Sequence, residues 1–469
     1  MEESNSLKRS VDWTVPATLV IGTLGSTGLF GLVPYTYNII GPGTIIVWIF
    51  TLICGFISAL VLAYTSTIWP DKAGAIYYPV RMALKEPWGS IAGWAFIITW
   101  ATGPVITAQI LARYLFESMI LRQIFAGIIL TIFLFLNLFN IKISGLVQII
   151  LSVLKVIPLV IVSIVGLFYI DLSNFTPLWR PGVLDPSTLT GIILAFFASS
   201  MVASWSTYVT EAFASITPEV SDPHKNVPKA ALIACLIAVM YIALVNIFAV
   251  GVLGDELSEL QNPLFEAGKR VLGYVGYSLL FIALSTGVLG AINACFIVAS
   301  RTMYQMAFEG VLPRIFMKLN KHLVPWPSIV FIYALNILML VYTPLYIAAI
   351  AIVQVPGMLV RFLLGIACIR IRLTRKWHEK AAFKASWTLI IANFIVGVIS
   401  LIYIYSYGVL YGWSDIILGI VFIVVITIKS ISYYNVKTAL NNRLNFNNKY
   451  GGYETKTLKS YVGLEWYII

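Results

Sequence analysis

The feature that most constrains this chain is a series of apolar segments, each about as long as a membrane is thick. A helix needs about 20 apolar residues to cross the hydrocarbon core of a bilayer. The segments are continuous and do not alternate over about ten residues, as the strands of a membrane barrel do. The sequence therefore predicts an all-α polytopic membrane protein with twelve transmembrane helices. The predicted spans are 14–37, 43–67, 89–112, 123–140, 146–169, 189–217, 230–253, 273–300, 327–343, 345–369, 387–408 and 412–433.

The composition excludes a soluble fold. Of the 469 residues, 59% are hydrophobic and 11% are charged, whereas a soluble domain carries about 25% charged residues. The polar residues 1–10 are not followed by a short apolar run with a small-residue cleavage site, as in a signal peptide. We therefore expect the first span to be retained in the membrane.

The positions of lysine and arginine predict the orientation of the chain, because cytoplasmic loops carry an excess of them. With a cytoplasmic N-terminus, 24 of the 31 fall on the cytoplasmic side, with Lys429 near the end of the last span included, five on the other side, and two, Lys155 and Arg361, well inside spans. We expect a multi-pass protein of the plasma membrane with a cytoplasmic N-tail (1–13) and a basic cytoplasmic C-tail (434–469). The net charge of +11 then faces anionic lipid and does not indicate nucleic-acid binding.

Residues that carry catalytic or metal chemistry do not gather in the spans. The four cysteines fall in apolar segments without disulfide or metal spacing, and the three histidines lie in polar connecting stretches. The spans contain no nucleophile–base pair, no His/Asp/Glu cluster and no phosphate-binding loop. We therefore expect neither an enzyme nor a bound metal or other cofactor. Rings of charge and filter repeats, which are typical of channels, are also missing from the sequence.

The first span is interrupted at its middle by small residues. Residues 22–31 include four glycines and three hydroxyl residues, and glycine is costly inside a helix. In lipid, unpaired backbone is tolerated only where it lines a protein cavity. One interpretation is that the helix unwinds here and turns N–H groups of its second half toward an anion such as a carboxylate. The other is a small-residue face for close helix packing.

The sixth span favours the first interpretation. Residues 199–211 are polar in the middle of a crossing and end at Glu211, which is expensive there unless it is paired or near water. This span lies five helices after the first. Two interrupted helices at matching positions are typical of a transporter made of two inverted five-helix repeats, here 14–169 and 189–369. The helices of 387–433 are then additional.

Several motifs resemble those of the amino acid–polyamine–organocation transporters, and the resemblance covers the chain up to about residue 433. It implies the LeuT-type fold with discontinuous helices 1 and 6. It also implies secondary active transport of amino acids, by alternating access around a mid-membrane site, or exchange of amino acids and polyamines. The motifs, which follow the family's order, lie at 26–30, 69–77, 140–148, 154–159, 218–230 and 293–313.

The resemblance further implies a substrate site at the two breaks. N–H groups after the first break would bind the substrate carboxylate, and carbonyl groups at both breaks would bind the ammonium. Trp205 is similar to the version of helix 6 found in the branch that exchanges cationic amino acids and amines. There the ring stacks on a cation, worth about 0.5–2 kcal/mol; alternatively, Trp205 is only a bulky gate residue. The predicted substrate-binding residues are Leu24, Gly25, Ser26, Thr27, Gly28, Ser204, Trp205, Ser206 and Tyr208.

Three positions depart from the family's pattern. Ser26 replaces the first glycine of the helix 1 motif, and Val209 replaces the glycine of helix 6. The second departure moves the expected break in helix 6 toward 204–207. Tyr64 replaces an acidic residue found after helix 2 in many members, which says little about function.

Lys155 and Glu211 are the predicted coupling or gating residues. A lysine about ten residues into the fifth span costs a few kcal/mol, unless it snorkels to the cytoplasmic interface. The resemblance places Lys155 where sodium-coupled relatives hold an ion between helices 1, 5 and 8. The helix 8 positions that carry a Ser-Thr pair in many members are Gly290 and Ala291. We therefore expect proton coupling or sodium-independent exchange, with H⁺ as the coupling ion.

Other readings remain open from the sequence. A sensor that binds an amino acid without transporting it is disfavoured, because the tails are too short for a soluble domain. Arg361 in the tenth span receives no role. The expected partners are an amino acid or amine substrate and the lipid bilayer, and nothing in the sequence predicts an oligomeric state.

Overall fold

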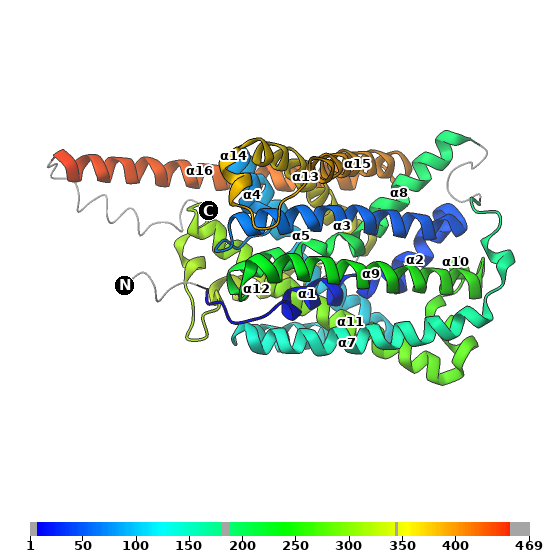
Figure 1. Cartoon of the computed structure of the whole chain (residues 1–469). Coiled ribbons are helices and arrows are strands. Elements are labelled where there is room, and N and C mark those ends of the chain that lie inside the picture. The colour runs from blue at the N-terminus through cyan, green and yellow to red at the C-terminus, as the bar shows by residue number, and fades with distance from the viewer. Residues whose placement is uncertain (1–6, 181–187, 343–345, 451–469) are drawn as a thin grey trace.

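The computed structural model describes residues 7–180, 188–342 and 346–450. In this part of the chain every named element is a helix, and the long helices lie side by side as one bundle (Figure 1). In chain order the elements are α1 (Thr14–Thr23), α2 (Ser26–Ile40), η2 (Gly41–Gly43), α3 (Thr44–Ile68), α4 (Tyr77–Leu84), α5 (Trp88–Leu115), α6 (Met119–Asn137), α7 (Ile141–Gly166), η3 (Leu167–Tyr169), η4 (Leu172–Phe175), α8 (Leu189–Thr207), η5 (Tyr208–Glu219), α9 (Pro223–Leu253), α10 (Glu256–Glu259), α11 (Pro263–Phe308), η6 (Arg314–Met317), α12 (Trp326–Tyr342), α13 (Tyr346–Leu373), α14 (Arg375–Lys380), α15 (Trp387–Tyr411) and α16 (Ser414–Tyr450).

The predicted membrane spans are present as helices. Ten stretches of the described residues are long and apolar enough to cross a membrane. The first stretch, Thr14–Ile68, contains two predicted spans, which the 3₁₀ turn η2 separates. The shorter apolar helix Trp326–Val341 corresponds to the ninth span. These helices account for the twelve predicted crossings, so the all-α polytopic class is confirmed.

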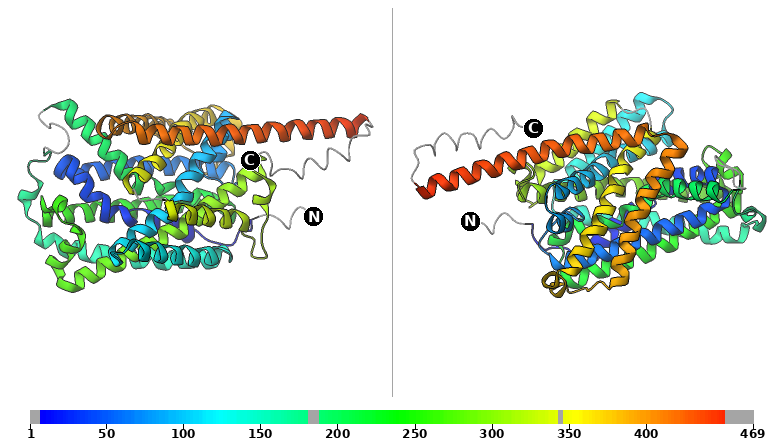
Figure 2. Two further views of the ribbon diagram at one scale, coloured as in Figure 1. Left: turned by 180° about the vertical axis from the view of Figure 1, so that it is seen from behind. Right: turned by 90° about the horizontal axis from the view of Figure 1, so that it is seen from above.

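Two helices extend the furthest beyond their predicted spans. α11 begins at Pro263, ahead of the predicted start at residue 273, and bends at Leu272 and Gly273, where the backbone leaves helical geometry. α16 continues past the predicted end at residue 433 to Tyr450 and projects from the bundle (Figures 1 and 2). The predicted C-tail therefore begins as a continuation of the last helix, and its residues 451–469 lie outside the described part of the chain.

The first helix of the bundle is broken among its glycines, as predicted. α1 ends at Thr23 and α2 begins at Ser26, and the two residues between them leave helical geometry. Gly25 has φ = +66°, in the left-handed region that glycine enters without the steric cost of a Cβ. Gly25 therefore allows the chain to end one helix and start the next at this depth.

The sixth helix changes its geometry at the edge of the predicted window 204–207. α8 ends at Thr207, and the chain continues as the 3₁₀ helix η5. The Gly25 N–H donates to the Ser206 carbonyl at 3.2 Å, which joins the two breaks. A Cβ on Gly28 would overlap with Ser206 Oγ. The small residues of helix 1 therefore serve both interpretations of the sequence, because they allow the break and the close packing of α2 on α8.

A side chain from α12 bonds the backbone of α5 around a proline that lies inside this helix. Pro104 lacks an N–H and disturbs the helical hydrogen bonds around it. The Asn336 amide accepts from the Val105 N–H at 2.8 Å and donates to the Ala101 carbonyl at 2.7 Å. Both of these backbone groups next to Pro104 therefore have a hydrogen-bond partner, as backbone in a membrane requires.

Buried amides hold α7 against α1 and α11. The Asn293 amide of α11 donates to the Ser144 carbonyl at 2.9 Å and to Gln148 Oε1 at 2.8 Å. Gln148 in turn donates to the Thr18 carbonyl of α1 at 3.1 Å. Both amide side chains are fully buried, so their hydrogen bonds fix the three helices around the first break.

Candidate functional site

A cavity of about 700 Å³, part of it open to solvent, lies beside the two breaks. Residues of α1, α2, α5, α8, η5, α11 and α13 line it, together with Ile76 just ahead of α4. Its walls are mostly apolar, aromatic or hydroxyl-bearing. Five of the predicted site residues line the cavity, namely Ser26, Thr27, Trp205, Ser206 and Glu211.

The other predicted residues lie behind this wall. Leu24 and Gly25 form the turn between α1 and α2, and Gly28 faces Ser206 of α8. Ser204 Oγ accepts from the Gln354 amide of α13 at 2.7 Å, so its hydroxyl joins two helices. These residues shape the breaks without lining the cavity. The side chain of Tyr208 lies outside the described part of the structure.

The start of α2 offers the features of an anion site. A helix leaves its first N–H groups without partners inside the helix, and in α2 these belong to Ser26, Thr27 and Gly28. The helix dipole adds partial positive charge at the same end. Ser26 Oγ donates to the Thr23 carbonyl at 2.6 Å, which turns its hydroxyl toward α1. The backbone of this turn is therefore prepared to accept a carboxylate from the cavity.

Lys155 of α7 is fully buried against the end of α1. Its ammonium donates to the carbonyls of Ile21, Gly22 (3.1 Å) and Leu24 (2.7 Å). The alternative that Lys155 snorkels to the interface is therefore wrong. Those carbonyls are the acceptors that a helix end leaves without N–H partners, and they carry partial negative charge. Lys155 thus provides hydrogen-bond donors to the carbonyls that have no N–H partner at the end of α1.

The Leu24 carbonyl has two donors. Besides Lys155, the Tyr241 hydroxyl of α9 donates to it at 2.5 Å, and Lys155 lies 3.3 Å from the same hydroxyl. A carbonyl oxygen has two lone pairs. In this conformation the carbonyl that the resemblance offered to a substrate ammonium is therefore occupied by the protein.

A glycine of α11 leaves room for the lysine. A Cβ on Gly287 would lie 2.9 Å from Lys155 Cδ, closer than real Cβ atoms come. The lysine therefore fills the space where α1, α7 and α11 meet. Among the described residues, no group of three or more His, Cys, Asp or Glu is placed to hold a metal ion.

The sequence reasoning missed the partner of Glu211. The carboxylate forms an ion pair with Arg361 of α13, and each side chain is 5% exposed. Both residues line the cavity. Arg361 Nη1 also donates to the Gly357 carbonyl one turn earlier, at 3.3 Å. The signal was available, because Arg361 and Lys155 were basic residues well inside predicted spans and a buried carboxylate needs an opposite charge.

Several lining residues were also missed, because the sequence does not reveal which face of a span meets the cavity. From α5 come Phe96, Trp100 and Thr107, and from α11 comes Cys295. With Trp205 they give one part of the cavity an aromatic and apolar wall. That wall suits an uncharged side chain of a ligand.

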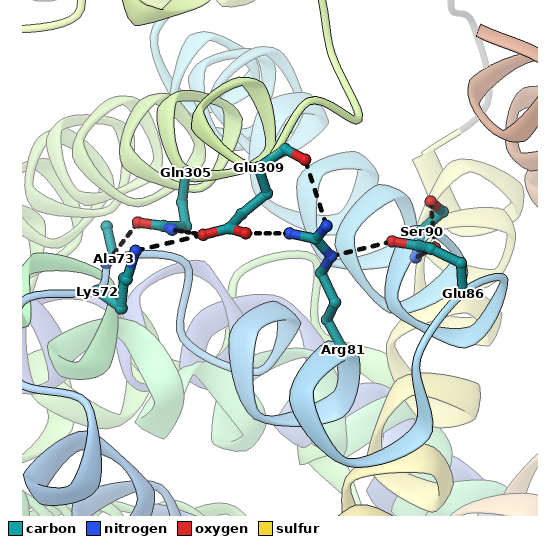
Figure 3. A network of polar contacts seen from close by, with 7 residues as sticks. All are labelled: Lys72, Ala73, Arg81, Glu86, Ser90, Gln305 and Glu309. Atoms are coloured by element: carbon teal, nitrogen blue, oxygen red, sulfur yellow. Dashed lines mark hydrogen bonds and ion pairs between the residues drawn. The ribbon is translucent and has the colours of Figure 1, made fainter. Parts of the chain in front are cut away.

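A second polar network links α4 to the end of α11 (Figure 3). Arg81 of α4 pairs with Glu309, which follows α11, and with Glu86 at 3.2 Å. Lys72 reaches Glu309 from the other side at 3.3 Å, and Gln305 donates to it at 3.0 Å. The network ties α4 to the end of α11 on the side where the described N-terminal segment lies.

The comparisons with known proteins define the family. The model of the amino acid permease family matches residues 13–441. The match covers most of the chain, so this protein belongs to that family.

The relatives in this family are amino acid transporters. The chain is 27% identical to the D-serine/D-alanine/glycine transporter of Escherichia coli K12 over 402 residues, which are 81% of this chain and 84% of the relative. It is 26% identical to the serine/threonine exchanger SteT of Bacillus subtilis over 374 residues, 75% and 81% of the two chains. It is 25% identical to the mouse large neutral amino acids transporter small subunit 2 over 367 residues, 73% and 66% of the two.

The fold is shared with a solved structure. The crystal structure of MhsT in complex with L-phenylalanine superposes with a TM-score of 0.63, at 15% sequence identity, and covers 85% of this chain and 99% of that one. The predicted LeuT-type fold with two broken helices is therefore confirmed.

Proposed function

We propose that this protein is a secondary active transporter that carries neutral amino acids across the plasma membrane without sodium. The observation that carries the proposal is the pairing at the first break. There, a helix N-terminus lies at the cavity between the two broken helices, and a buried lysine binds the carbonyls on the other side. The three relatives named above bear names of transporters or exchangers of uncharged amino acids.

The substrate carboxylate is the group that the site suits best. It would lie at the first turn of α2, against the N–H groups of Ser26 and Thr27. The side chain of the bound amino acid would extend toward the aromatic wall near Trp100 and Trp205. An amino acid bound in this way touches both breaks, so its binding couples the two helices whose halves must move in alternating access.

Lys155 is proposed as the fixed cation that replaces a coupling sodium ion. Its ammonium joins α7 to the end of α1 and to Tyr241 of α9. Release of its proton would remove the charge that holds these carbonyls, and α1 would then move more freely. The protein would work either as a proton symporter or as an exchanger of two amino acids.

The proposed orientation places both termini in the cytoplasm. The excess of lysine and arginine in alternate loops supports this orientation. The network of Arg81 and Glu309 (Figure 3) then lies at the cytoplasmic end, where it would hold that side closed.

Uptake into proteoliposomes tests the proposal. The purified protein is supplied with radiolabelled serine, leucine, phenylalanine, lysine and glutamate, with and without sodium, a proton gradient or internal substrate. We expect uptake of uncharged amino acids that is unchanged when choline replaces sodium. Uptake that rises with the proton gradient identifies a symporter, and uptake that needs internal substrate identifies an exchanger. Binding without any uptake would overturn the transport function in favour of a sensor.

A Lys155→Ala variant tests the coupling role. We expect the variant to bind substrate but to lose its response to the proton gradient, because the group that takes up and releases the proton is missing. Ser163→Ala, on the same helix and also fully buried, serves as a control for a substitution in α7. A Lys155→Ala variant that keeps a full proton dependence would sink the coupling role.

A further inference from the structure

The cavity contains one pair of opposite charges. Among the described residues that line it, Glu211 and Arg361 are the ones with charged side chains, and they neutralise one another. The carboxylate comes from η5 and the guanidinium from α13, so the pair bridges two helices at the cavity wall. Neither charge is held by solvent, because each side chain is 5% exposed.

We propose that the Glu211–Arg361 pair sets the charge preference of the substrate side chain and makes the site select uncharged amino acids. This inference rests on the proposed function and specifies its substrate class. A lysine side chain in the cavity would meet the Arg361 guanidinium, and a glutamate side chain would meet the Glu211 carboxylate. Either charge would have to leave water for an apolar wall without a free partner, and such a transfer is expensive.

The same geometry predicts that removing one charge of the pair would change which charge on a substrate side chain is preferred. Without the guanidinium, the Glu211 carboxylate would stand alone in the cavity wall and attract a cationic side chain. Without the carboxylate, Arg361 would attract an anionic side chain. The sequence had suggested cation stacking on Trp205. In this protein the nearby guanidinium opposes that role, because a second cation at the same wall is repelled.

The neighbouring contacts support a role at the cavity. Arg361 Nη1 donates to the Gly357 carbonyl at 3.3 Å, and Gly357 itself lines the cavity. A Cβ at Gly357 would meet only ordinary contacts, at 3.5 Å from Thr99 Oγ1 and 3.8 Å from Arg361 Nη1. Gly357 and the Arg361 guanidinium therefore lie next to one another at the cavity wall, where a substrate side chain would lie.

A buried pair elsewhere in the protein provides a matched control. Arg301 of α11 and Glu219 at the end of η5 are 1% and 2% exposed and bond in two places, at 2.9 and 3.1 Å. The two residues do not line the cavity. An Arg301→Gln variant therefore breaks a pair of the same chemistry and burial without placing a charge in the substrate site.

The experiment measures binding with pairs of ligands that differ chiefly in charge. Lysine is compared with norleucine, and glutamate with glutamine, by scintillation proximity binding to the purified protein. The variants are Arg361→Gln, Glu211→Gln, the double variant with both substitutions, and Arg301→Gln. Binding is measured without transport, so a defect in coupling does not obscure the result.

The expected outcome is a crossed pattern. Arg361→Gln raises the affinity for lysine relative to norleucine by about tenfold or more, and Glu211→Gln raises that for glutamate relative to glutamine by a similar factor, as expected for a charge a few ångströms away. The double variant returns both ratios toward those of the unchanged protein. The double variant is also the control for folding, since it leaves no unpaired buried charge. Arg301→Gln leaves both ratios unchanged.

Two other outcomes are informative. If the protein binds norleucine and glutamine but no single variant shifts either ratio by more than twofold, the pair does not set charge preference and the inference is wrong. It is also wrong if Arg301→Gln shifts the ratios as Arg361→Gln does. If the unchanged protein binds no amino acid at all, the proposed function itself fails.

Discussion

The contact between Gly28 and Ser206 offers a direct test of how the two breaks are packed. A methyl group at Gly28 would overlap Ser206 Oγ and lie 2.6 Å from Ser206 Cβ. Real Cβ atoms do not approach this closely, so α2 and α8 must separate in a Gly28→Ala variant. Ser206→Gly removes both atoms that block the methyl group. In the variant with both substitutions, α2 carries a side chain at this contact and α8 does not.

The magnitude follows from this geometry. Overpacking of a well-filled interior costs about 1–3 kcal/mol, and we expect Gly28→Ala to lower the free energy of unfolding by about 2 kcal/mol within that range. Ser206→Gly costs about 0.5–1 kcal/mol, since glycine disfavours a helix. In the double variant the overlap is absent, so its loss should be smaller than the sum of the two by at least about 1 kcal/mol.

The assay is equilibrium unfolding of the four proteins in mixed micelles, combined with substrate binding. Gly127→Ala in α6 is the control, because its methyl group would meet only Leu340 at an ordinary 3.6 Å. It should be neutral or slightly stabilising. If the losses of Gly28→Ala and Ser206→Gly add within about 0.3–0.5 kcal/mol, α2 and α8 are not in contact at these residues, and the described packing is refuted.

Two further predictions concern the predicted cytoplasmic end. Glu309→Gln removes the charge shared by Arg81 and Lys72. If the loss destabilises this segment by about 1.4 kcal/mol, hydrogen exchange of residues 72–84 should rise about tenfold. As a control, Glu266→Gln, whose contact with Lys269 is long and exposed, should leave this exchange unchanged. Burial, followed by the charges of Arg372 and Lys384, lowers the pKa of His378, so its contribution to stability is present above its ordinary pKa of about 6.5 and is lost as pH falls through the folded value. Corrected hydrogen exchange in α14 should therefore rise from pH 7.5 to pH 5.5, and a His378→Gln variant that shows the same rise would contradict this assignment.

The breaks in the helices were predictable because they depend on local chemistry. Four glycines within ten residues weaken any helix, so the interruption near Gly25 follows from the sequence without knowledge of its neighbours. The end of α8 was predicted with similar success, within the window 204–207. In both cases the signal lies in a few adjacent residues, and a resemblance to a known family agreed with it.

The partners of the buried charges were not predictable in the same way. Glu211 and Arg361 are 150 residues apart, and their pairing depends on how η5 and α13 are placed across the cavity. The acceptors of Lys155 are backbone carbonyls, which every residue has, so no sequence pattern could identify them. A span shows that a charge is buried, but only the packing of helices shows what neutralises it. The predicted sensor, symport and exchange alternatives depend on motion and stay open for the same reason.

The two sides of the first break differ in whether the protein itself supplies a partner for the backbone groups. This difference determines which backbone groups remain for a ligand. At the first break the protein supplies its own cation, since Lys155 and Tyr241 occupy the carbonyls at the end of α1. The N–H groups at the start of α2 receive no equivalent anion from Glu211, because that carboxylate is engaged by Arg361. The break therefore presents an unbalanced positive helix end to the cavity. A carboxylate is the ligand group that restores the balance, so the carboxylate of the substrate should contribute more to binding in this conformation than its ammonium. Binding of an amino acid amide should be weakened more than binding of the corresponding N-acetyl amino acid, and the reverse order would show that the ammonium is the principal anchor.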